Sequence, residues 1–363
     1  MNDNFIEKAF SLAEESVGKV SPRPPVGAVI IKNNKIISEG KTDPQPGNHA
    51  EVNAIESSNE DLSDTALICT LEPHSYHGFS PPCTEAIIKS GIKKVMCPIE
   101  DPNPKVSGNG FRQLKSAGIK IERNFPKKYL IRAKKIIEGF EKSINHNLPF
   151  VSLKVASSLD GKTATNSKQS KWITSEESRD YGRLLRTKYD GVMTGINTIL
   201  SDNPQLTYRD KFGKNTGYPR YKIILDSHGK INANSKIFES KEKIIIFTTH
   251  KNNIKFKKEN LEVIVVESQN EKTNLNEVMK SINNMGIHKV LVESGNFLNT
   301  ELIRKKLVDK VYFFIAPKII GGEKTSFGDI GIKNIEDIIK LKDVEYKKLR
   351  EDILISGSVK ENE

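Results

Sequence analysis

Hydrophobic and polar positions follow two different periods along the first 145 residues. Segments with a helical period lie at 3–17, 49–58, 83–90, 109–117 and 127–145. Short apolar segments rich in β-branched residues lie between them, at 26–31, 35–40, 66–71, 93–98 and 119–123. Because helices and strands that alternate in this way pack as layers, the pattern predicts an α/β domain.

A second series of strand patterns begins after the polar segment 145–150, which reads Asn-His-Asn-Leu-Pro-Phe. This segment ends a long helical pattern, so we predict two domains, residues 1–145 and residues 150–363. The tail from Asp343 to Val359 alternates around Arg350-Glu351-Asp352 and predicts an edge hairpin. The other predicted strands are nearly continuous in apolar residues, as in a sheet covered on both faces: Val151–Ser157, Gly191–Thr194, Tyr221–Asp226, Lys243–Thr248, Leu261–Val266, Lys289–Glu293 and Val311–Pro317.

Composition narrows the class of protein. The formal net charge is +11, but much of it is lysine in loops such as 251–258, without interleaved aromatic residues. This predicts solvated surface rather than a nucleic-acid groove, and a basic field also attracts phosphorylated small molecules. No apolar run is long enough to span a bilayer, and the acidic N-terminus does not read as a signal peptide. We therefore expect a soluble cytoplasmic protein that does not bind membranes.

The three cysteines exclude a disulfide framework. Cys69 and Cys97 lie in apolar strand patterns and are predicted to be buried small hydrophobes. Only Cys83 has a sequence context that suggests chemistry.

That context is a set of metal-ligand residues in order along the chain: His49-Ala50-Glu51, then Glu72-Pro73-His74, then Pro81-Pro82-Cys83. A zinc deaminase holds its metal with one His and two thiolates, and a nearby Glu moves protons. Here His74 stands where a thiolate is expected. We predict that His49, His74 and Cys83 bind zinc and that Glu51 is the catalytic acid/base. The alternatives are that His77 is the ligand in place of His74, or that the site holds no zinc.

His49 and Glu51 are two residues apart and would point to different sides of a regular helix. They can serve one site only if His49 lies at a helix entrance, with Asn48 as a suitable N-cap. Pro81-Pro82 likewise predicts a helix that starts at Cys83, whose N-terminal end would favour the thiolate.

With these motifs in order, the chain resembles the bifunctional deaminase/reductase family of riboflavin biosynthesis. The resemblance rests on residues 24–30, 49–52, 70–73, 81–83 and 100–104 and on Gly78. It implies a cytidine-deaminase-like first domain. The chain departs from the family's usual Glu-Pro-Cys-Ser-His-Tyr-Gly at residues 72–78, and Arg23 replaces an Asn.

The resemblance continues through segments 153–162, 170–174, 195–198, 202–207, 225–227, 292–295 and 316–318. It implies a dihydrofolate-reductase-like second domain that uses NADPH, and a homodimer. The residues that it places along the cofactor are Ala156, Trp172, Thr198, Asp202, Ser227 and the turn from Gly295. Those that it places against the substrate are Ser170, Arg186, Leu206, Arg209 and Glu293. An arginine suits the ribose phosphate because its fork binds pairs of oxygens.

The function that the resemblance implies has two steps. The first domain would deaminate a diaminopyrimidinone that carries a phosphoribosylamino group, and the second would reduce the ribosyl group to ribityl with NADPH. An alternative, based on Arg23 and His74, keeps only the reductase. An RNA-binding or RNA-editing deaminase is a third hypothesis, which the absence of a basic stripe with stacking aromatics disfavours.

Overall fold

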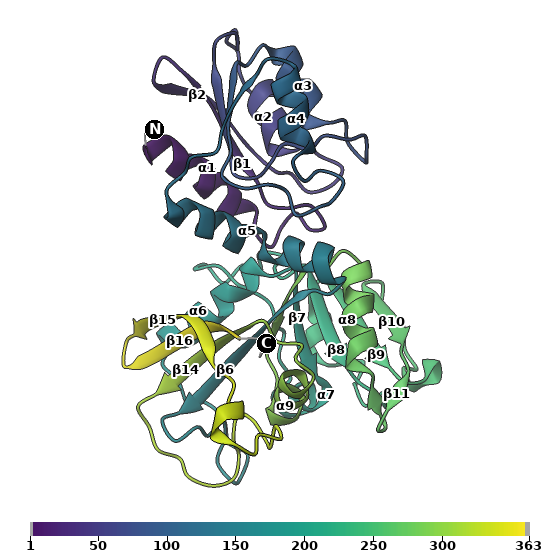
Figure 1. The fold of residues 1–363 in the computed structure, drawn as a ribbon. Helices are drawn as coiled ribbons and strands as arrows, with labels where there is room; N and C mark the ends of the chain where they lie inside the picture. The colour runs from purple at the N-terminus through teal and green to yellow at the C-terminus, as the bar shows by residue number, and fades with distance from the viewer. Residues whose placement is uncertain (1–2, 360–363) are drawn as a thin grey trace. The chain divides into compact units, whose positions relative to one another are not determined.

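The computed structural model describes residues 3–359, and its contacts divide the chain into two compact units, Met1–Leu148 and Pro149–Glu363. The boundary between the units falls inside the polar segment 145–150. Each unit contains its own large sheet, as Figure 1 shows.

In the described part of the first unit, five strands form one sheet in the order β2-β1-β3-β4-β5. β1 is antiparallel to both of its neighbours, whereas β3, β4 and β5 run parallel. A strand forms at every position predicted in this half. The bounds are β1 (Gly27–Lys32), β2 (Lys35–Lys41), β3 (Ala66–Cys69), β4 (Lys94–Met96) and β5 (Lys120–Glu122).

Helices cover both faces of this sheet. They are α1 (Asp3–Ser16), α2 (Ala50–Glu56), α3 (Cys83–Ser90), α4 (Asn109–Ser116) and α5 (Lys127–His146). α1 contacts β1 and α5, whereas α2 contacts β1, β2 and α3. A Cβ atom at Gly40 would lie 2.1 Å from the carbonyl oxygen of Ala50. The absence of that atom therefore lets α2 pack closely on β2.

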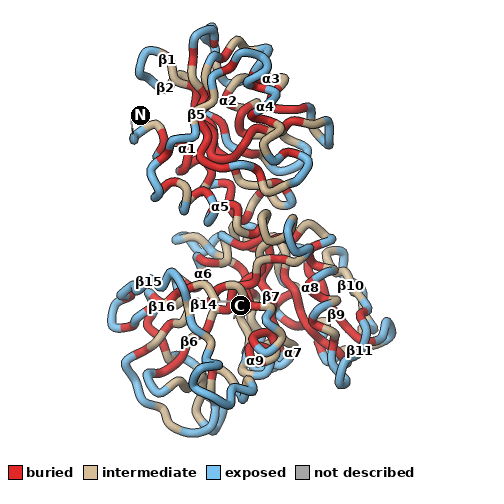
Figure 2. The backbone as a smooth tube through the Cα atoms, in the orientation of Figure 1, coloured by how far each residue is buried: buried red, intermediate tan, exposed pale blue. Residues whose placement is uncertain are grey.

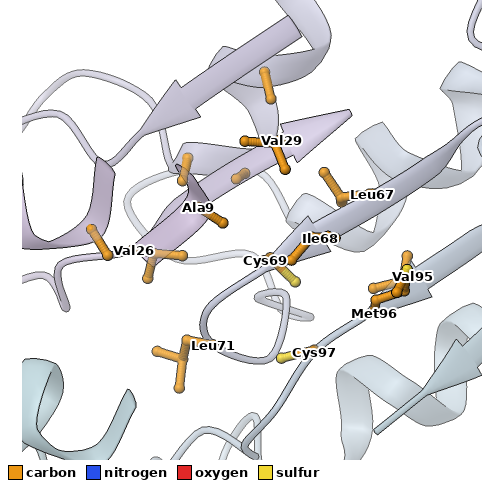
Figure 3. Packing of buried hydrophobic residues seen from close by; sticks show 14 of the residues in the cluster. Ala9, Val26, Val29, Leu67, Ile68, Cys69, Leu71, Val95, Met96 and Cys97 are labelled. Atoms are coloured by element: carbon orange, nitrogen blue, oxygen red, sulfur yellow. The ribbon is translucent and has the colours of Figure 1, made fainter. Parts of the chain in front are cut away.

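The core of the first unit lies between the sheet and these helices, and it is drawn in red in Figure 2. Figure 3 shows β1, β3 and β4 contributing Val29, Ile68 and Val95 to it. Cys69 and Cys97 are completely buried in the same cluster and form no disulfide. The prediction that they are core residues is confirmed.

The second unit, over its described residues, has a nine-stranded sheet in the order β10-β9-β8-β7-β13-β6-β14-β16-β15. The strands from β10 to β14 in this order are parallel, and β16 and β15 complete the edge as an antiparallel hairpin. The predicted strands and edge hairpin are confirmed. The bounds are β6 (Phe150–Ser158), β7 (Gly191–Gly195), β8 (Tyr221–Leu225), β9 (Lys243–Thr248), β10 (Leu261–Val265), β13 (Lys289–Val292), β14 (Lys310–Ala316), β15 (Leu341–Leu349) and β16 (Asp352–Val359).

The helices of the second unit connect these strands. They are α6 (Glu176–Leu185), α7 (Ile196–Asp202), α8 (Leu275–Asn284) and α9 (Asn296–Arg304), with short 3₁₀ turns at Arg186–Lys188, Lys236–Glu239, Lys251–Asn253 and Ile335–Asp337. A separate small hairpin consists of β11 (Ser268–Gln269) and β12 (Lys272–Thr273). Between residues 3 and 359, no helix has the length and apolar character needed to cross a membrane.

Candidate functional site

Three predicted metal ligands meet in the first unit. His49 precedes α2, His74 follows β3, and Cys83 is the first residue of α3. Their ligand atoms all lie within 4.8 Å of one another, and His49 Nδ1 is 3.2 Å from Cys83 Sγ. The fold therefore brings together donors from three separate segments of sequence.

The chemistry of this donor set fits zinc. His74 Nδ1 is buried and has no hydrogen-bond partner, as expected of an atom that binds a metal. Burial lowers the pKa of His49 to about 4, with help from Arg23 and His74, and burial also lowers the pKa of His74. Both rings are therefore neutral near pH 7, which is the form that binds a metal. Imidazole and thiolate are both zinc ligands, and three protein ligands leave the fourth position of a tetrahedral zinc ion open.

The Cys83 thiol differs from the sequence-based expectation. Burial, together with the neighbouring Glu51 carboxyl, raises its pKa well above the usual range, so the start of α3 does not by itself favour the thiolate. The reason is that a fully buried sulfur loses more from desolvation than one helix end returns. A coordinated zinc ion deprotonates such a thiol directly.

Glu51 is the second residue of α2, two residues after His49; it lies against Cys83 and is almost completely buried. Burial raises the pKa of its carboxyl to about 7. It lines the same cavity as His49 and His74, whose volume is about 540 Å³. A carboxyl group with a pKa near neutrality can both take up and release protons during turnover, so the position suits an acid/base.

The entrance to α2 explains how residues two apart in sequence share one cavity. His49 is the N-cap, with an extended backbone (φ −77°, ψ 162°), so its side chain does not follow the helical spiral. The predicted helix entrance is confirmed, but Asn48 as its N-cap is wrong. The Asn48 side chain instead donates to Glu56 Oε2 at 2.8 Å.

His77 is not part of the ligand cluster. Its side chain is exposed, and its Nε2 atom is 3.0 Å from Glu85 Oε1. Among the described residues, the group that can hold a metal is therefore His49, His74 and Cys83.

Two residues that shape this cavity, Glu72 and Ser80, have no role predicted from the sequence. The buried Glu72 carboxylate accepts hydrogen bonds from the backbone N–H groups of Asp101, Gly108 and Phe111, which fixes the loop before α4. Ser80 Oγ lies 3.4 Å from His49 Nε2, the ring nitrogen that faces away from Cys83. Glu72 and Ser80 flank the ligand motifs, and that proximity was the one available signal.

A second cavity, of about 490 Å³, lies in the second unit. It is formed where the adjacent strands β8, β7 and β13 end, next to the N-termini of α7 and α9. Three residues predicted to contact the cofactor, Thr198, Ser227 and Gly295, line it. Nucleotides bind at such strand ends in open parallel sheets.

The other residues predicted to contact the cofactor lie outside the lining of this cavity. Ala156 is on β6, opposite Phe314 of β14. Trp172 is 63% exposed, with the guanidinium of Arg179 4.4 Å from its ring centroid. Asp202 is the last residue of α7. Their cofactor contacts stay predictions.

Two of the predicted substrate residues form a half-buried ion pair. Arg186 Nε and Nη2 donate to the two carboxylate oxygens of Glu293 at 2.6 and 3.0 Å, and Arg186 Nη1 donates to the Thr207 carbonyl oxygen at 2.7 Å. Leu206 is buried beside Thr207.

The remaining two are differently placed. Arg209 donates to Gln205 Oε1 and to the Gly213 carbonyl oxygen, and Ser170 is partly buried in the loop before α6. Substrate binding by all five stays a prediction.

A deaminase-type ligand cluster in one α/β unit and a nucleotide-sized cavity in a second define a two-domain enzyme. Residues 1–99 match the family model of the cytidine and deoxycytidylate deaminase zinc-binding region, and residues 149–355 match that of the RibD C-terminal domain. The chain belongs to the RibD family of riboflavin biosynthesis proteins.

Relatives match over nearly the whole chain. The riboflavin biosynthesis protein RibD of Aquifex aeolicus is 36% identical over 98% of this chain and 98% of its own. That of Escherichia coli is 29% identical, again over 98% of both chains. A Thermotoga maritima deaminase/reductase structure has a TM-score of 0.85 at 35% identity, covering 98% of both chains. A structure of Acinetobacter baumannii RibD has a TM-score of 0.86 at 30% identity, covering 99% of this chain and 98% of the other.

The family fixes the class of chemistry. The chain is a bifunctional enzyme of riboflavin biosynthesis, with a zinc-dependent deaminase domain of the cytidine-deaminase type followed by an NADPH-dependent reductase domain. The predictions of fold, enzyme class and cofactors are confirmed. The reductase-only and RNA-editing alternatives are not favoured.

Proposed function

We propose that this chain deaminates a phosphoribosylamino-diaminopyrimidinone in its first unit and reduces the ribosyl group of the product to ribityl in its second. The Thermotoga maritima relative is described as a diaminohydroxyphosphoribosylaminopyrimidine deaminase and 5-amino-6-(5-phosphoribosylamino)uracil reductase. The observation that carries the deaminase half is the meeting of His49, His74 and Cys83 beside a buried Glu51.

In the deamination, a ring amino group leaves as ammonia and a water oxygen becomes the ring carbonyl. His49, His74 and Cys83 would hold zinc, which supplies Lewis acidity to activate the water. Glu51 carries the two water protons in turn, one to the ring nitrogen and one to the amino group that leaves as ammonia. Its burial keeps bulk water from competing for these protons.

In the reduction, NADPH supplies a hydride and the protein supplies position. Thr198, Ser227 and Gly295 line the cofactor cavity, and the N-terminus of α9 after Gly295 offers backbone N–H groups to a phosphate. We propose that Arg186 and Glu293 hold the substrate beside this cavity, together with Ser170, Leu206 and Arg209. Ala156, Trp172 and Asp202 would complete the cofactor site.

The decisive experiment supplies purified, zinc-loaded protein with the aminated pyrimidine, with and without NADPH. We expect ammonia release in both cases and NADPH oxidation only after deamination. The matched variant is Glu51→Gln, which should lower ammonia release by roughly 10²- to 10⁴-fold. It should leave the reduction of the deaminated pyrimidine unchanged. Absence of ammonia release by the unmodified protein would falsify the deaminase half alone.

Oligomeric state and location are part of the same proposal. We propose a homodimer in the cytoplasm. Tyr346 and Ile353 on the β15–β16 edge hairpin are exposed, which favours a second copy of the chain covering this edge. The three free cysteines are typical of a protein in a reducing compartment. Sedimentation velocity would detect the dimer, and a purely monomeric protein at micromolar concentration would contradict it.

A further inference from the structure

Arg23 is a buried cation in the wall of the metal-site cavity. Only 6% of its surface is exposed, and it lines the cavity together with His49 and Glu51. Its Nη1 donates to the backbone carbonyl oxygens of Asp43 and Gly47, and its Nη2 donates to Ser80 Oγ at 3.1 Å. All three acceptors are uncharged.

Across residues 3–359, Arg23 forms no ion pair. The nearest candidate, the Asp43 carboxylate, accepts instead from Asn53 Nδ2 at 2.8 Å. Of the other carboxyl groups of the cavity wall, Glu72 accepts from three backbone N–H groups, Asp101 accepts from the Asn103 N–H, and Glu51 lies against Cys83. Burying a charge without a counter-charge is costly, so this arrangement indicates an anionic partner from outside the chain.

The guanidinium keeps donors for that partner. Of its five N–H groups, three reach the acceptors named above, which leaves Nε–H and one Nη2 hydrogen without a protein acceptor among the described residues. Nε and Nη2 together form the fork that binds two oxygens of a phosphate or carboxylate. The neighbouring lining residues Pro22, Pro24 and Gln45 carry no charge that would compete.

We propose that Arg23 is the anion receptor of the metal-site cavity and binds the phosphate ester of the phosphoribosyl substrate. The inference rests on the proposed deaminase function and assigns the substrate's charged end to one side chain. Ser80, held by Arg23 and next to His49, links this receptor to the ligand cluster. Arg23 thereby determines specificity for phosphorylated over unphosphorylated pyrimidine ribosides.

The test compares the full-length zinc-loaded protein with Arg23→Gln, which keeps hydrogen-bond donors, and with Arg23→Lys, which keeps the charge. Each receives the phosphorylated pyrimidine and its dephosphorylated riboside. We expect Arg23→Gln to lower kcat/KM for the phosphorylated substrate by roughly 10- to 100-fold through KM, as for loss of a charged hydrogen bond. The riboside should change by less than about 3-fold, and Arg23→Lys should fall between. NADPH oxidation on deaminated substrate serves as the control for folding.

An equal loss on both substrates would overturn the inference, since Arg23 would then only connect the loops at residues 43–47 and 78–80. So would no loss on either substrate.

A second readout separates this inference from the proposed function. Cobalt(II) bound in place of zinc gives a visible spectrum that reports on the His49–His74–Cys83 site alone. We expect inorganic phosphate and ribose 5-phosphate to change it saturably in the unmodified protein and at least 10-fold more weakly in Arg23→Gln.

If this difference is seen without any deamination, the anion receptor stands and the proposed substrate fails. If deamination occurs but neither phosphate probe perturbs the cobalt spectrum, the anion receptor fails and the proposed function stands.

Discussion

At the scale of single residues, the ligand cluster shows how the site accommodates His74 at the position where the family usually has a Cys. The His74 Nδ1 atom is buried without any hydrogen-bond partner, and a ring nitrogen of His74 lies within 4.8 Å of the other ligand atoms. His77, three residues later, is exposed and paired with Glu85. One imidazole therefore takes the place of a thiolate, which leaves a bound zinc ion with one negative charge fewer around it.

This arrangement predicts how metal content responds to substitution. His74→Ala should weaken zinc binding by roughly 100-fold or more, because it removes a direct ligand, whereas His74→Cys should keep the metal. His77→Ala is the matched control and should bind zinc like the unmodified protein. Zinc per chain, measured by atomic emission after dialysis, gives the answer. Zinc loss in the His77 variant with retention in His74→Ala would exchange the roles of the two residues.

At the scale of elements, the packing of α2 on β2 determines where His49 and Glu51 lie. Gly40 on β2 faces the helix backbone, and a Cβ atom there would lie 2.1 Å from Ala50 O and 2.4 Å from Ala54 N. Neither contact can be relieved by a side-chain rotation, since both atoms belong to the backbone of α2.

Gly40→Ala should therefore displace the helix and the site with it. We expect a loss of roughly 3 kcal/mol in the stability of the first unit and reduced zinc content. The control is Gly118→Ala, where a Cβ atom meets nothing within 4 Å and only the positive φ of 82° costs about 1 kcal/mol. Thermal unfolding and metal analysis measure both effects. Equal behaviour of the two variants would show that α2 can shift freely.

In the second unit, the Arg186–Glu293 pair joins the end of α6 to the end of β13. Burial alone would raise the pKa of Glu293, but the Arg186 guanidinium outweighs it and holds the pKa below the usual range. A carboxyl whose pKa is lower in the folded state stabilises the fold above its unfolded pKa of about 4.3. That contribution is lost as the pH falls through the lower, folded pKa.

The unfolding of the second unit is identified as the transition whose midpoint temperature rises with NADPH. We expect this midpoint temperature to fall as the pH is lowered from 7 to below about 4. Glu293→Gln should lower the free energy of unfolding of the second unit by roughly 3 kcal/mol at pH 7. It should also reduce the dependence of this stability on acid pH. The double variant Arg186→Met with Glu293→Gln should recover part of the loss, because it leaves no buried charge unpaired. Scanning calorimetry measures each. If the stability of the Glu293→Gln variant depends on acid pH as before, that dependence comes from other carboxyl groups.

At the scale of the whole molecule, the metal cluster and the nucleotide-sized cavity lie in different compact units. Each unit has its own sheet, and each cavity is lined by residues of one unit only. Chemistry that depends on one site should therefore survive damage to the other.

Removal of the metal tests this independence. Treatment with a zinc chelator should abolish ammonia release, while NADPH oxidation on the deaminated pyrimidine continues at its original rate. Added zinc should restore ammonia release. A parallel loss of both activities, with no unfolding of the second unit, would contradict the separation.

The sequence by itself determined the strands, the helices of the first unit, the family and the candidate metal ligands, with His77 left as an alternative to His74. Strand and helix patterns are local, and metal ligands need particular residue types, so both can be seen in the order of residues. The entrance of α2 at His49 was predictable for the same reason.

Only the tertiary structure decided which polar groups have partners. It placed His77 in solvent beside Glu85, gave Glu72 to three backbone N–H groups, and raised the pKa of Cys83 through burial. It also buried Arg23 without a carboxylate partner. Burial and pairing depend on segments far apart in the chain, and for that reason no local pattern could reveal them.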